Sequence, residues 1–388
     1  MTNTLTPSNT AELVEAVRST PRVIAVGAGT KSRLSAVNAV KISTAKLSGM
    51  VEYEPSEFTF TALAGTPVRE IAATLAARGQ YLPFDPLWVD AGATLGGTVA
   101  SGVSGPGRFR FGGLRDFILG VQFVDGAGCL LRLGGKVVKN AAGFDVPKFF
   151  VGSLGRFGVL VETTFKVFPQ PASRLTLTLD VSDPESAVKI LTAAANSRWE
   201  AYALDWLPDR KSIALRLGGP ATALPSLAQE ILSRWPGKQL NETEANELWS
   251  DLREFRWTTA SGPLDNRSSR REEAHSNPRE SSQSLLTSAA TVIKVALAPG
   301  NLVAFHQSLA ALPGARVHVS AGGNVAFVSL ADAAQAVTLD QKLQTQKLSG
   351  VTLRGDAPLW LGARPQFQIS EAVKTALDAE NRFPGLND

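Results

Sequence analysis

Cysteine and histidine are scarce in this sequence of 388 residues. It has one cysteine, Cys129, and three histidines, His275, His306 and His318, which all follow residue 270. One cysteine excludes a disulfide within the chain and any iron–sulfur cluster ligated by its own cysteines. The few, late histidines argue against a histidine-rich metal site and against a histidine-dependent nucleophilic triad in the first half. No metal site is predicted.

Long apolar runs and dense charge clusters are also missing. No stretch approaches the roughly 18 residues of a membrane-spanning helix, and MTNTLTPSNT at the N-terminus has no signal-peptide pattern. The formal net charge is +4, and the excess lies in the N-terminal half. A mild excess suits a bound phosphate or a small anionic substrate better than nucleic acid. We therefore predict a cytoplasmic protein, with any association with the inner membrane made through partners.

Length and composition predict two domains. A chain of 388 residues with 44% hydrophobic content is too long to fold around one small core. "FPQPAS" (Phe168–Ser173) has the composition of a linker, which divides the chain into 1–172 and 173–388. Residues 261–284 are polar, with almost no apolar side chain to offset the entropy of ordering them. They are predicted to form a disordered surface insertion.

The second half repeats one pattern of elements. A strand, a helix, two strands and a helix are predicted at 175–181, 184–196, 201–207, 212–217 and 221–235. The same order returns at 291–297, 301–311, 315–320, 324–330 and 333–347, closed by a strand at 351–354. Two split βαβ units side by side form one antiparallel sheet with helices on a single face. The fold class is therefore predicted to be α+β.

The first half has fewer helix signals and more glycine. Asn9 has the N-cap position of a helix over 11–19, and Thr66 that of a helix starting at Pro67 and ending before Gly79. A short helix is predicted near 147–151. Strands are predicted at 22–26, 58–65 and 158–168.

The turn in "VIAVGAGTKSRL" (Val23–Leu34) resembles two phosphate-binding motifs but matches neither. A Walker loop ends in Gly-Lys-Ser/Thr, whereas here threonine separates glycine from lysine. A Rossmann fingerprint needs a third glycine and a following helix, and both are missing. A turn whose consecutive N–H groups bind phosphate remains possible, with a plain β-turn as the alternative.

Two further segments are rich in small residues. "DAGATLGGTVASGVSG" (Asp90–Gly105) combines a glycine pair with hydroxyl side chains, and "KNAAGFDVPKFFVGSLGRFGVL" (Lys139–Leu160) has many glycines and no histidine or cysteine. A diphosphate accepts many hydrogen bonds, and small-residue loops on opposite sides of it have this composition. The three segments predict one site for a large nucleotide ligand.

Together these segments resemble the PCMH-type FAD-binding domain of the vanillyl-alcohol-oxidase family of FAD-linked oxidases. The resemblance rests on "VGAGT" (Val26–Thr30), "ATLGGTVASGVSG" (Ala93–Gly105), "FGGLRDFILGVQFVDGAG" (Phe111–Gly128) and the stretch from Lys139 to Val167. Within the family, the sequence is most similar to the FAD-binding E subunits of bacterial glycolate oxidases. The resemblance implies a first domain of two α/β subdomains.

The resemblance also implies the residues of a cofactor site. The pyrophosphate of non-covalent FAD would lie on the first turn, with the second segment opposite and the third along the nucleotide and flavin. The implied residues are Gly27, Ala28, Gly29, Thr30, Lys31 and Ser32; Thr94, Gly96, Gly97, Thr98 and Ser101; and Gly152, Ser153, Gly155, Gly158 and Val159. A covalent flavin link is not expected, because no His or Cys lies near the first turn.

The implied activity is oxidation of glycolate to glyoxylate within a complex. Electrons would pass to a partner or acceptor, and the implied partners are a flavin-bearing catalytic subunit and an iron–sulfur subunit. The histidine-rich Gly-Asp-Gly-Asn motif of catalytic relatives survives only as Gly322-Gly323-Asn324, which also fits a hairpin turn, and His318 fits a strand residue. No catalytic residue is therefore assigned. The alternatives are a self-sufficient FAD-dependent oxidoreductase of another 2-hydroxy acid or alcohol, and a structural subunit with a non-cycling flavin.

Overall fold

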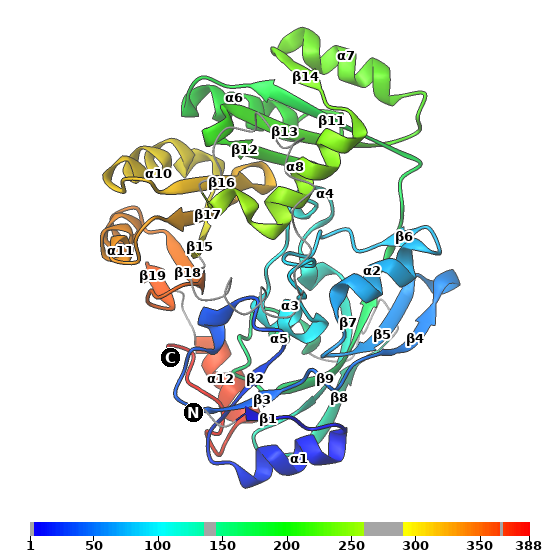
Figure 1. The fold of residues 1–388 in the computed structure, drawn as a ribbon, viewed down its shortest axis with the longest axis vertical. Coiled ribbons are helices and arrows are strands. Elements are labelled where there is room, and N and C mark those ends of the chain that lie inside the picture. The colour runs from blue at the N-terminus through cyan, green and yellow to red at the C-terminus, as the bar shows by residue number, and fades with distance from the viewer. Residues whose placement is uncertain (1–3, 136–144, 260–289, 365–367) are drawn as a thin grey trace, which may run out of the picture.

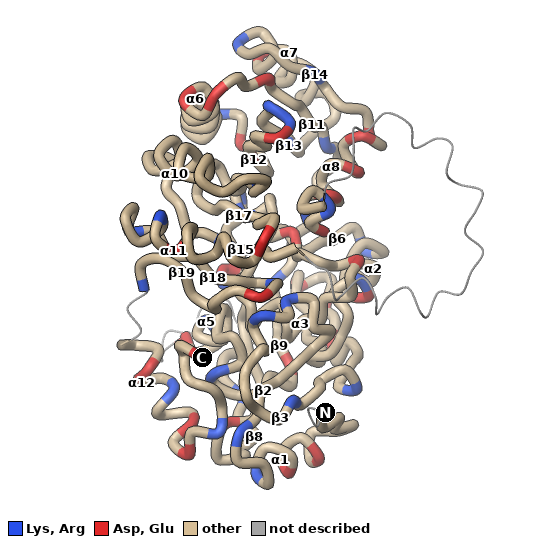
Figure 2. The backbone as a smooth tube through the Cα atoms, turned by 60° about the vertical axis from the view of Figure 1, so that its left-hand side comes forward, with Lys and Arg blue, Asp and Glu red and all other residues tan. Residues whose placement is uncertain are grey.

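The computed structural model describes residues 4–135, 145–259, 290–364 and 368–388. The sheets of the first domain lie at one end of the molecule and the large sheet of the second domain at the other (Figure 1). Lys and Arg are interspersed with Asp and Glu along the chain (Figure 2). The predicted insertion at 261–284 falls outside the described residues.

The first subdomain is a small parallel sheet with one long helix. Its strands β1 (Thr4–Leu5), β3 (Val40–Ser43) and β2 (Val23–Val26) lie in the order β1-β3-β2. Helix α1 (Thr10–Ser19) begins as predicted, because the Asn9 side chain accepts a hydrogen bond from the Glu12 N–H. Its apolar face buries Leu13 and Val17.

The second subdomain is a five-stranded antiparallel sheet with short helices. The strand order is β4 (Met50–Glu54), β5 (Thr59–Leu63), β9 (Val159–Lys166), β7 (Ile118–Val124) and β8 (Leu130–Gly134). The helices are α2 (Val68–Ala76), α3 (Leu95–Ser101), α4 (Arg108–Phe111) and α5 (Pro147–Phe150). Thr66 does not cap α2, contrary to the prediction; the N-cap is Pro67, and the Thr66 hydroxyl bonds the Gly49 backbone instead.

The predicted linker lies where the chain leaves the first domain. Strand β10 (Phe168–Pro169) pairs with β6 (Gln80–Tyr81), and β11 begins at Ser173. The predicted boundary at 172/173 thus falls between β10 and β11.

The second domain is built on a nine-stranded sheet in which all neighbouring strands are antiparallel. Its strands are β11 (Ser173–Asp180), β12 (Ala203–Leu207), β13 (Ser212–Gly219), β14 (Gly237–Gln239), β15 (Thr291–Ala296), β16 (Arg316–Ser320), β17 (Val325–Leu330), β18 (Ser349–Arg354) and β19 (Trp360–Gly362). The order is β14-β11-β13-β12-β16-β17-β15-β18-β19. The predicted split βαβ units are β11-β13-β12 and β15-β17-β16, which meet at β12 and β16.

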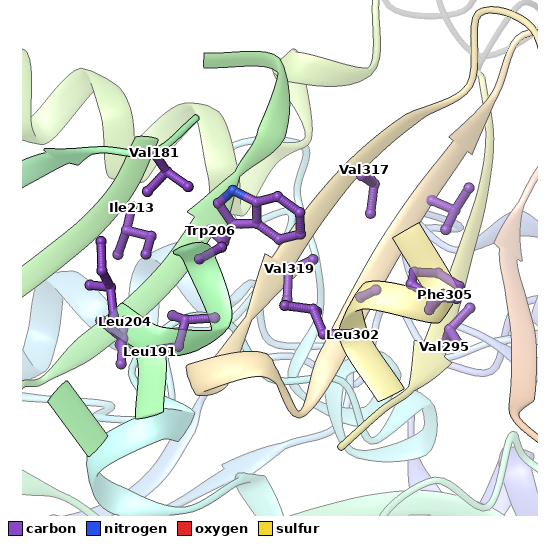
Figure 3. Packing of buried hydrophobic residues seen from close by; sticks show 14 of the residues in the cluster. Val181, Leu191, Leu204, Trp206, Ile213, Val295, Leu302, Phe305, Val317 and Val319 are labelled. Carbon is purple, nitrogen blue, oxygen red and sulfur yellow. The ribbon is translucent and has the colours of Figure 1, made fainter. Parts of the chain in front are cut away.

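Four helices cover one face of this sheet: α6 (Pro184–Ala195), α7 (Leu224–Arg234), α10 (Leu302–Ser308) and α11 (Gln335–Thr345). Trp206 lies opposite Val319 where the two units meet, and the apolar side chains of both units form one core (Figure 3).

The helices of the two predicted units lie on one face of the sheet, as expected, but a further helix covers the opposite face. Helix α8 (Glu242–Glu254) packs Leu248 and Trp249 against Ala203 and Ala214 on the opposite face. The strands therefore bury both faces, and α8 covers the side turned toward the first domain.

The C-terminal residues return to the first domain. Val373 and Leu377 of α12 (Gln368–Leu377) pack on the core of the antiparallel sheet of that domain, and Phe383 is buried beside Leu13 and Val17. Residues 368–388, which the sequence-based division places in 173–388, thus supply apolar side chains to the cores of the first domain.

Candidate functional site

A pocket in the first domain is lined mainly by three segments that lie far apart in the sequence, with Thr44 and Ala64 between them. The three segments are the turn after β2, helix α3 with its N-cap, and the loop before β9 with the start of that strand. The pocket holds about 730 Å³ of space, counting the solvent at its mouth. The predicted residues that line it are Gly27, Ala28, Gly29, Thr30, Lys31, Thr94, Gly96, Gly97, Ser101, Ser153, Gly155 and Gly158.

The turn after β2 offers free hydrogen-bond donors. The N–H groups of residues 28–31 have no acceptor among the described residues. Gly29 has φ +68°, and a Cβ built there would meet no atom within 4 Å. Consecutive amides around a left-handed residue form a concave anion site. This wall suits the oxygens of a phosphate group.

Helix α3 contributes shape rather than donors. The Leu95 N–H donates to the Thr66 carbonyl and the Gly96 N–H to the Ala64 carbonyl, so the first helical amides are already bonded. The Ser101 hydroxyl donates to the Thr98 carbonyl within the helix. The hydroxyl donors expected from this segment are therefore partly used by the helix itself.

Two glycines allow the walls to meet. A Cβ at Gly27 would lie 2.1 Å from Thr94 Oγ1, and one at Gly96 would lie 2.8 Å from the Ala64 Cβ. Real Cβ atoms do not approach so closely, so these positions need glycine because of protein atoms. Gly97 differs, since outside the backbone of α3 and the two neighbouring residues its built Cβ meets one described atom within 4 Å, Thr94 Oγ1 at 3.1 Å.

The third wall is bonded to the second. The Gly152 N–H donates to the Val99 carbonyl and the Leu154 N–H to the Ala100 carbonyl. The remaining predicted residues do not line the pocket. Ser32 is exposed, Thr98 and Val159 are buried, and Gly152 lies beside a second cavity.

Lys31 is a charged side chain on the pocket wall. It is 8% exposed, and its Nζ donates to Thr30 Oγ1 at 3.2 Å and lies 5.2 Å from the ring centroid of Trp88. Burial lowers the pKa of Lys31 to about 7, and the Arg354 charge adds to this effect. No ion pair to Lys31 occurs among the described residues.

The second domain holds the pocket turn in place. Arg354 at the end of β18 donates to the Thr30 carbonyl, and its guanidinium lies 4.6 Å from the ring centroid of Trp88. Trp88 stacks on Phe255 at 4.2 Å. In the opposite direction, Arg33 donates to the Ala357 carbonyl at 2.5 Å. Arg354 and Trp88 were not predicted as site residues, since no local sequence pattern links positions so far apart.

His318 lies in a buried polar cluster. Its Nε2 is 2.7 Å from Asp205 Oδ2, and the Ser320 hydroxyl donates to the same carboxylate. His318 is a strand residue of β16, and residues 321–323 form the turn to β17, as predicted. The described residues that line the pocket include no His or Cys.

Two further findings concern metals and membranes. Within the described ranges, no group of three or more His, Cys, Asp or Glu side chains is placed to hold a metal ion. In the same ranges, no helix combines the length and apolar character needed to cross a bilayer.

Comparison with known proteins shows a family match over much of the first domain. Residues 2–134 match the family described as FAD binding domain. The first two walls of the pocket lie within the matched residues, and FAD is the cofactor, as the resemblance implied. The free amides of the first turn fit its pyrophosphate.

Particular relatives are similar over part of the chain. Glycolate oxidase subunit GlcE of Escherichia coli (strain K12) is 38% identical over 212 residues, which are 53% of this chain and 56% of that protein. Glycolate oxidase subunit GlcD of Bacillus subtilis (strain 168) is 25% identical over 48% of this chain and 39% of that protein. D-2-hydroxyglutarate dehydrogenase of Stutzerimonas stutzeri (strain A1501) is 28% identical over 51% of this chain and 43% of that protein. The matches therefore cover about half or less of each relative's length.

The fold has solved counterparts. A structure of alkyldihydroxyacetonephosphate synthase superposes with a TM-score of 0.66 at 16% identity, covering 98% of this chain and 76% of that one. At this identity the likeness confirms the α+β fold and says nothing of activity.

Proposed function

We propose that this chain is the FAD-binding subunit of a glycolate oxidase or dehydrogenase complex, taking part in the oxidation of glycolate to glyoxylate. The observation that carries the proposal is the convergence of three predicted segments on one pocket, together with 38% identity to a glycolate oxidase subunit. Bound FAD would supply two-electron redox chemistry that no side chain offers. The free amides of the first turn would hold its pyrophosphate, and the small side chains of α3 would leave room for it.

The sixteen predicted residues would have two kinds of role. Those on the pocket wall would contact a non-covalent cofactor, whereas Ser32, Thr98, Gly152 and Val159 would support the walls. We assign no catalytic base, because no histidine lies among the described residues of the pocket wall and His318 is bonded to Asp205.

Electrons from such a flavin need an exit outside this chain. With one cysteine, the chain does not ligate an iron–sulfur cluster of its own. We therefore propose an iron–sulfur subunit as the acceptor and a flavin-bearing subunit that does the hydride chemistry. The similarity to a second glycolate oxidase subunit, GlcD, supports a fold shared between subunits of such a complex.

A self-sufficient dehydrogenase of another 2-hydroxy acid is the second candidate. It is favoured by the matches to D-2-hydroxyglutarate dehydrogenase at 28% identity and to D-lactate dehydrogenase of Anaerostipes hadrus at 28%. The third candidate is a structural subunit whose flavin does not cycle.

The test is the visible spectrum of the purified chain before and after adding glycolate without oxygen. We expect a yellow protein that stays oxidised alone and is reduced only when the partner subunits are added. Bleaching of the isolated chain by D-lactate or D-2-hydroxyglutarate would favour the second candidate. A yellow chain that is never reduced in an active complex would favour the structural role, and a colourless chain that takes up no FAD would contradict the proposal.

A further inference from the structure

Lys31 lies on the wall of the cofactor pocket, and no described carboxylate forms an ion pair with it. Within the described part of the chain, its ammonium group donates one hydrogen bond, to the neutral Thr30 hydroxyl, and it lies over the ring of Trp88. Because the side chain is 8% exposed, little water is available to solvate its charge. An empty pocket therefore disfavours the charged form of this lysine.

The charged groups around Lys31 come from two elements of the second domain. Arg354 at the end of β18 lies over the same Trp88 ring as Lys31 and repels its charge, while Glu254 at the end of α8 attracts it. Glu254 instead accepts hydrogen bonds from the Asp90 and Ala91 N–H groups. Burial lowers the pKa of Lys31 most, and the positive charge of Arg354 lowers it further. Together they outweigh the attraction of Glu254, so that the pKa is about 7.

A pyrophosphate on this turn would reverse the balance. An anion bound by the free amides of residues 28–31 would lie on the same turn as Lys31. Negative charge near a buried lysine favours its ammonium form, and the effect is stronger where the local dielectric is low. Lys31 would then hold its proton well above neutral pH.

We propose that FAD binding to this pocket is coupled to the uptake of one proton by Lys31, which then pairs with the cofactor's pyrophosphate. The inference rests on FAD binding in this pocket. Arg354 is the positioning residue, since it lowers the proton affinity of the empty site without lining the pocket.

The coupling has a definite sign. In the pH range in which Lys31 is neutral in the free chain but charged in the complex, FAD binding takes up one proton. In that range the dissociation constant for FAD rises with pH. One proton gives at most a tenfold rise per pH unit. The dissociation constant should therefore be flat below about pH 6 and rise towards this limit above pH 7, until the pKa of the complex is reached.

The experiment is titration calorimetry of the full chain, freed of cofactor, with FAD between pH 6 and pH 9. At pH 8, measurements in two buffers with different ionisation enthalpies give the number of protons taken up, which we expect to be close to one. A binding enthalpy independent of buffer and a flat dissociation constant would overturn the coupling. Absence of FAD binding at every pH would instead contradict the cofactor site itself.

Variants separate Lys31 from other titrating groups. Lys31→Arg keeps its charge throughout this range, so it should bind FAD with no proton uptake and a flat pH profile. Lys31→Met should bind FAD about tenfold or more weakly than the wild type at pH 6, and its dissociation constant should not depend on pH. A Lys31→Arg protein that keeps the wild-type pH dependence would overturn the proposal.

Arg354 has a matched control in Arg33. Both arginines donate to a backbone carbonyl across the contact between the turn and the second domain, but Arg354 shares Trp88 with Lys31. Arg354→Gln should move the onset of the rise in the dissociation constant to higher pH. Arg33→Gln loosens the same contact and should leave the onset unchanged. Equal shifts in both variants would show that Arg354 acts only through docking.

Discussion

Asp205 is a fully buried carboxylate at the junction of the two split βαβ units. It accepts hydrogen bonds from His318, from the Ser320 hydroxyl and from the Ala321 N–H at 3.1 Å. All three partners belong to β16 and the turn after it, whereas Asp205 belongs to β12. The carboxylate therefore links β12 to β16, two strands that pair at a single position, Trp206 with Val319.

We predict that Asp205→Ala lowers the free energy of unfolding by about 3 kcal/mol or more. Removing the acceptor leaves the polar groups of His318 and Ser320 buried without a partner, which is costly. Urea denaturation followed by fluorescence measures the change. Glu200→Ala breaks an exposed ion pair with Arg110 and is the control, expected to cost less than about 1 kcal/mol. Similar losses in both variants would contradict this view of the junction.

Helix α3 distinguishes glycines required by the fold from glycines required by a ligand. Gly96 and Gly97 are adjacent, yet the built Cβ of Gly96 clashes with Ala64, while that of Gly97 lies on the pocket wall. The sequence predicts the same cofactor-binding role for both glycines. They differ because only one of them lies on the side of the short helix that meets β5, which the sequence does not reveal.

Gly97→Val is predicted to fill the pocket and to keep the fold. Valine costs no more than glycine in a helix, so the melting temperature of the cofactor-free chain should change by no more than about 2 °C. The flavin content of the purified protein should fall by at least about tenfold, as measured by its absorbance. Gly96→Val should instead lower the melting temperature strongly. Normal flavin content in Gly97→Val would mean that the cofactor does not reach this wall.

Helices and strands with clear periodicity were predictable from the sequence. Helix α6 starts at Pro184 after an Asp183 N-cap, and its apolar residues recur at helical spacing, so both its ends follow from local chemistry. Helix α8 has a capping box at Asn241 and Glu244, a signal that the sequence analysis passed over. The pairing of Trp88 with Arg354 depends on the docking of two domains, which no local pattern encodes.

At the scale of the whole molecule, the C-terminal residues connect both domains to the pocket. The chain leaves β19 in the second domain and packs α12 on the first. Buried Arg156 donates to the Leu34 carbonyl on the pocket wall at 2.8 Å and to the Asp388 carbonyl at 2.9 Å. The pocket thus depends on residues more than 200 positions away in the sequence.

Phe383→Ala should therefore destabilise the first domain and weaken FAD retention, although Phe383 lies far from the pocket in sequence. Phe383 is 1% exposed and packs with Leu13 and Val17 beneath α1, so its loss leaves a cavity costing about 3–5 kcal/mol. Ile369→Ala, in the same C-terminal segment but at a side chain 69% exposed, is the control and should stay within about 0.5 kcal/mol. Urea denaturation with and without added FAD measures both effects. Were the segment only an appendage of the second domain, Phe383→Ala would leave FAD retention unchanged, because the apolar contacts that shape the first domain would be complete without it.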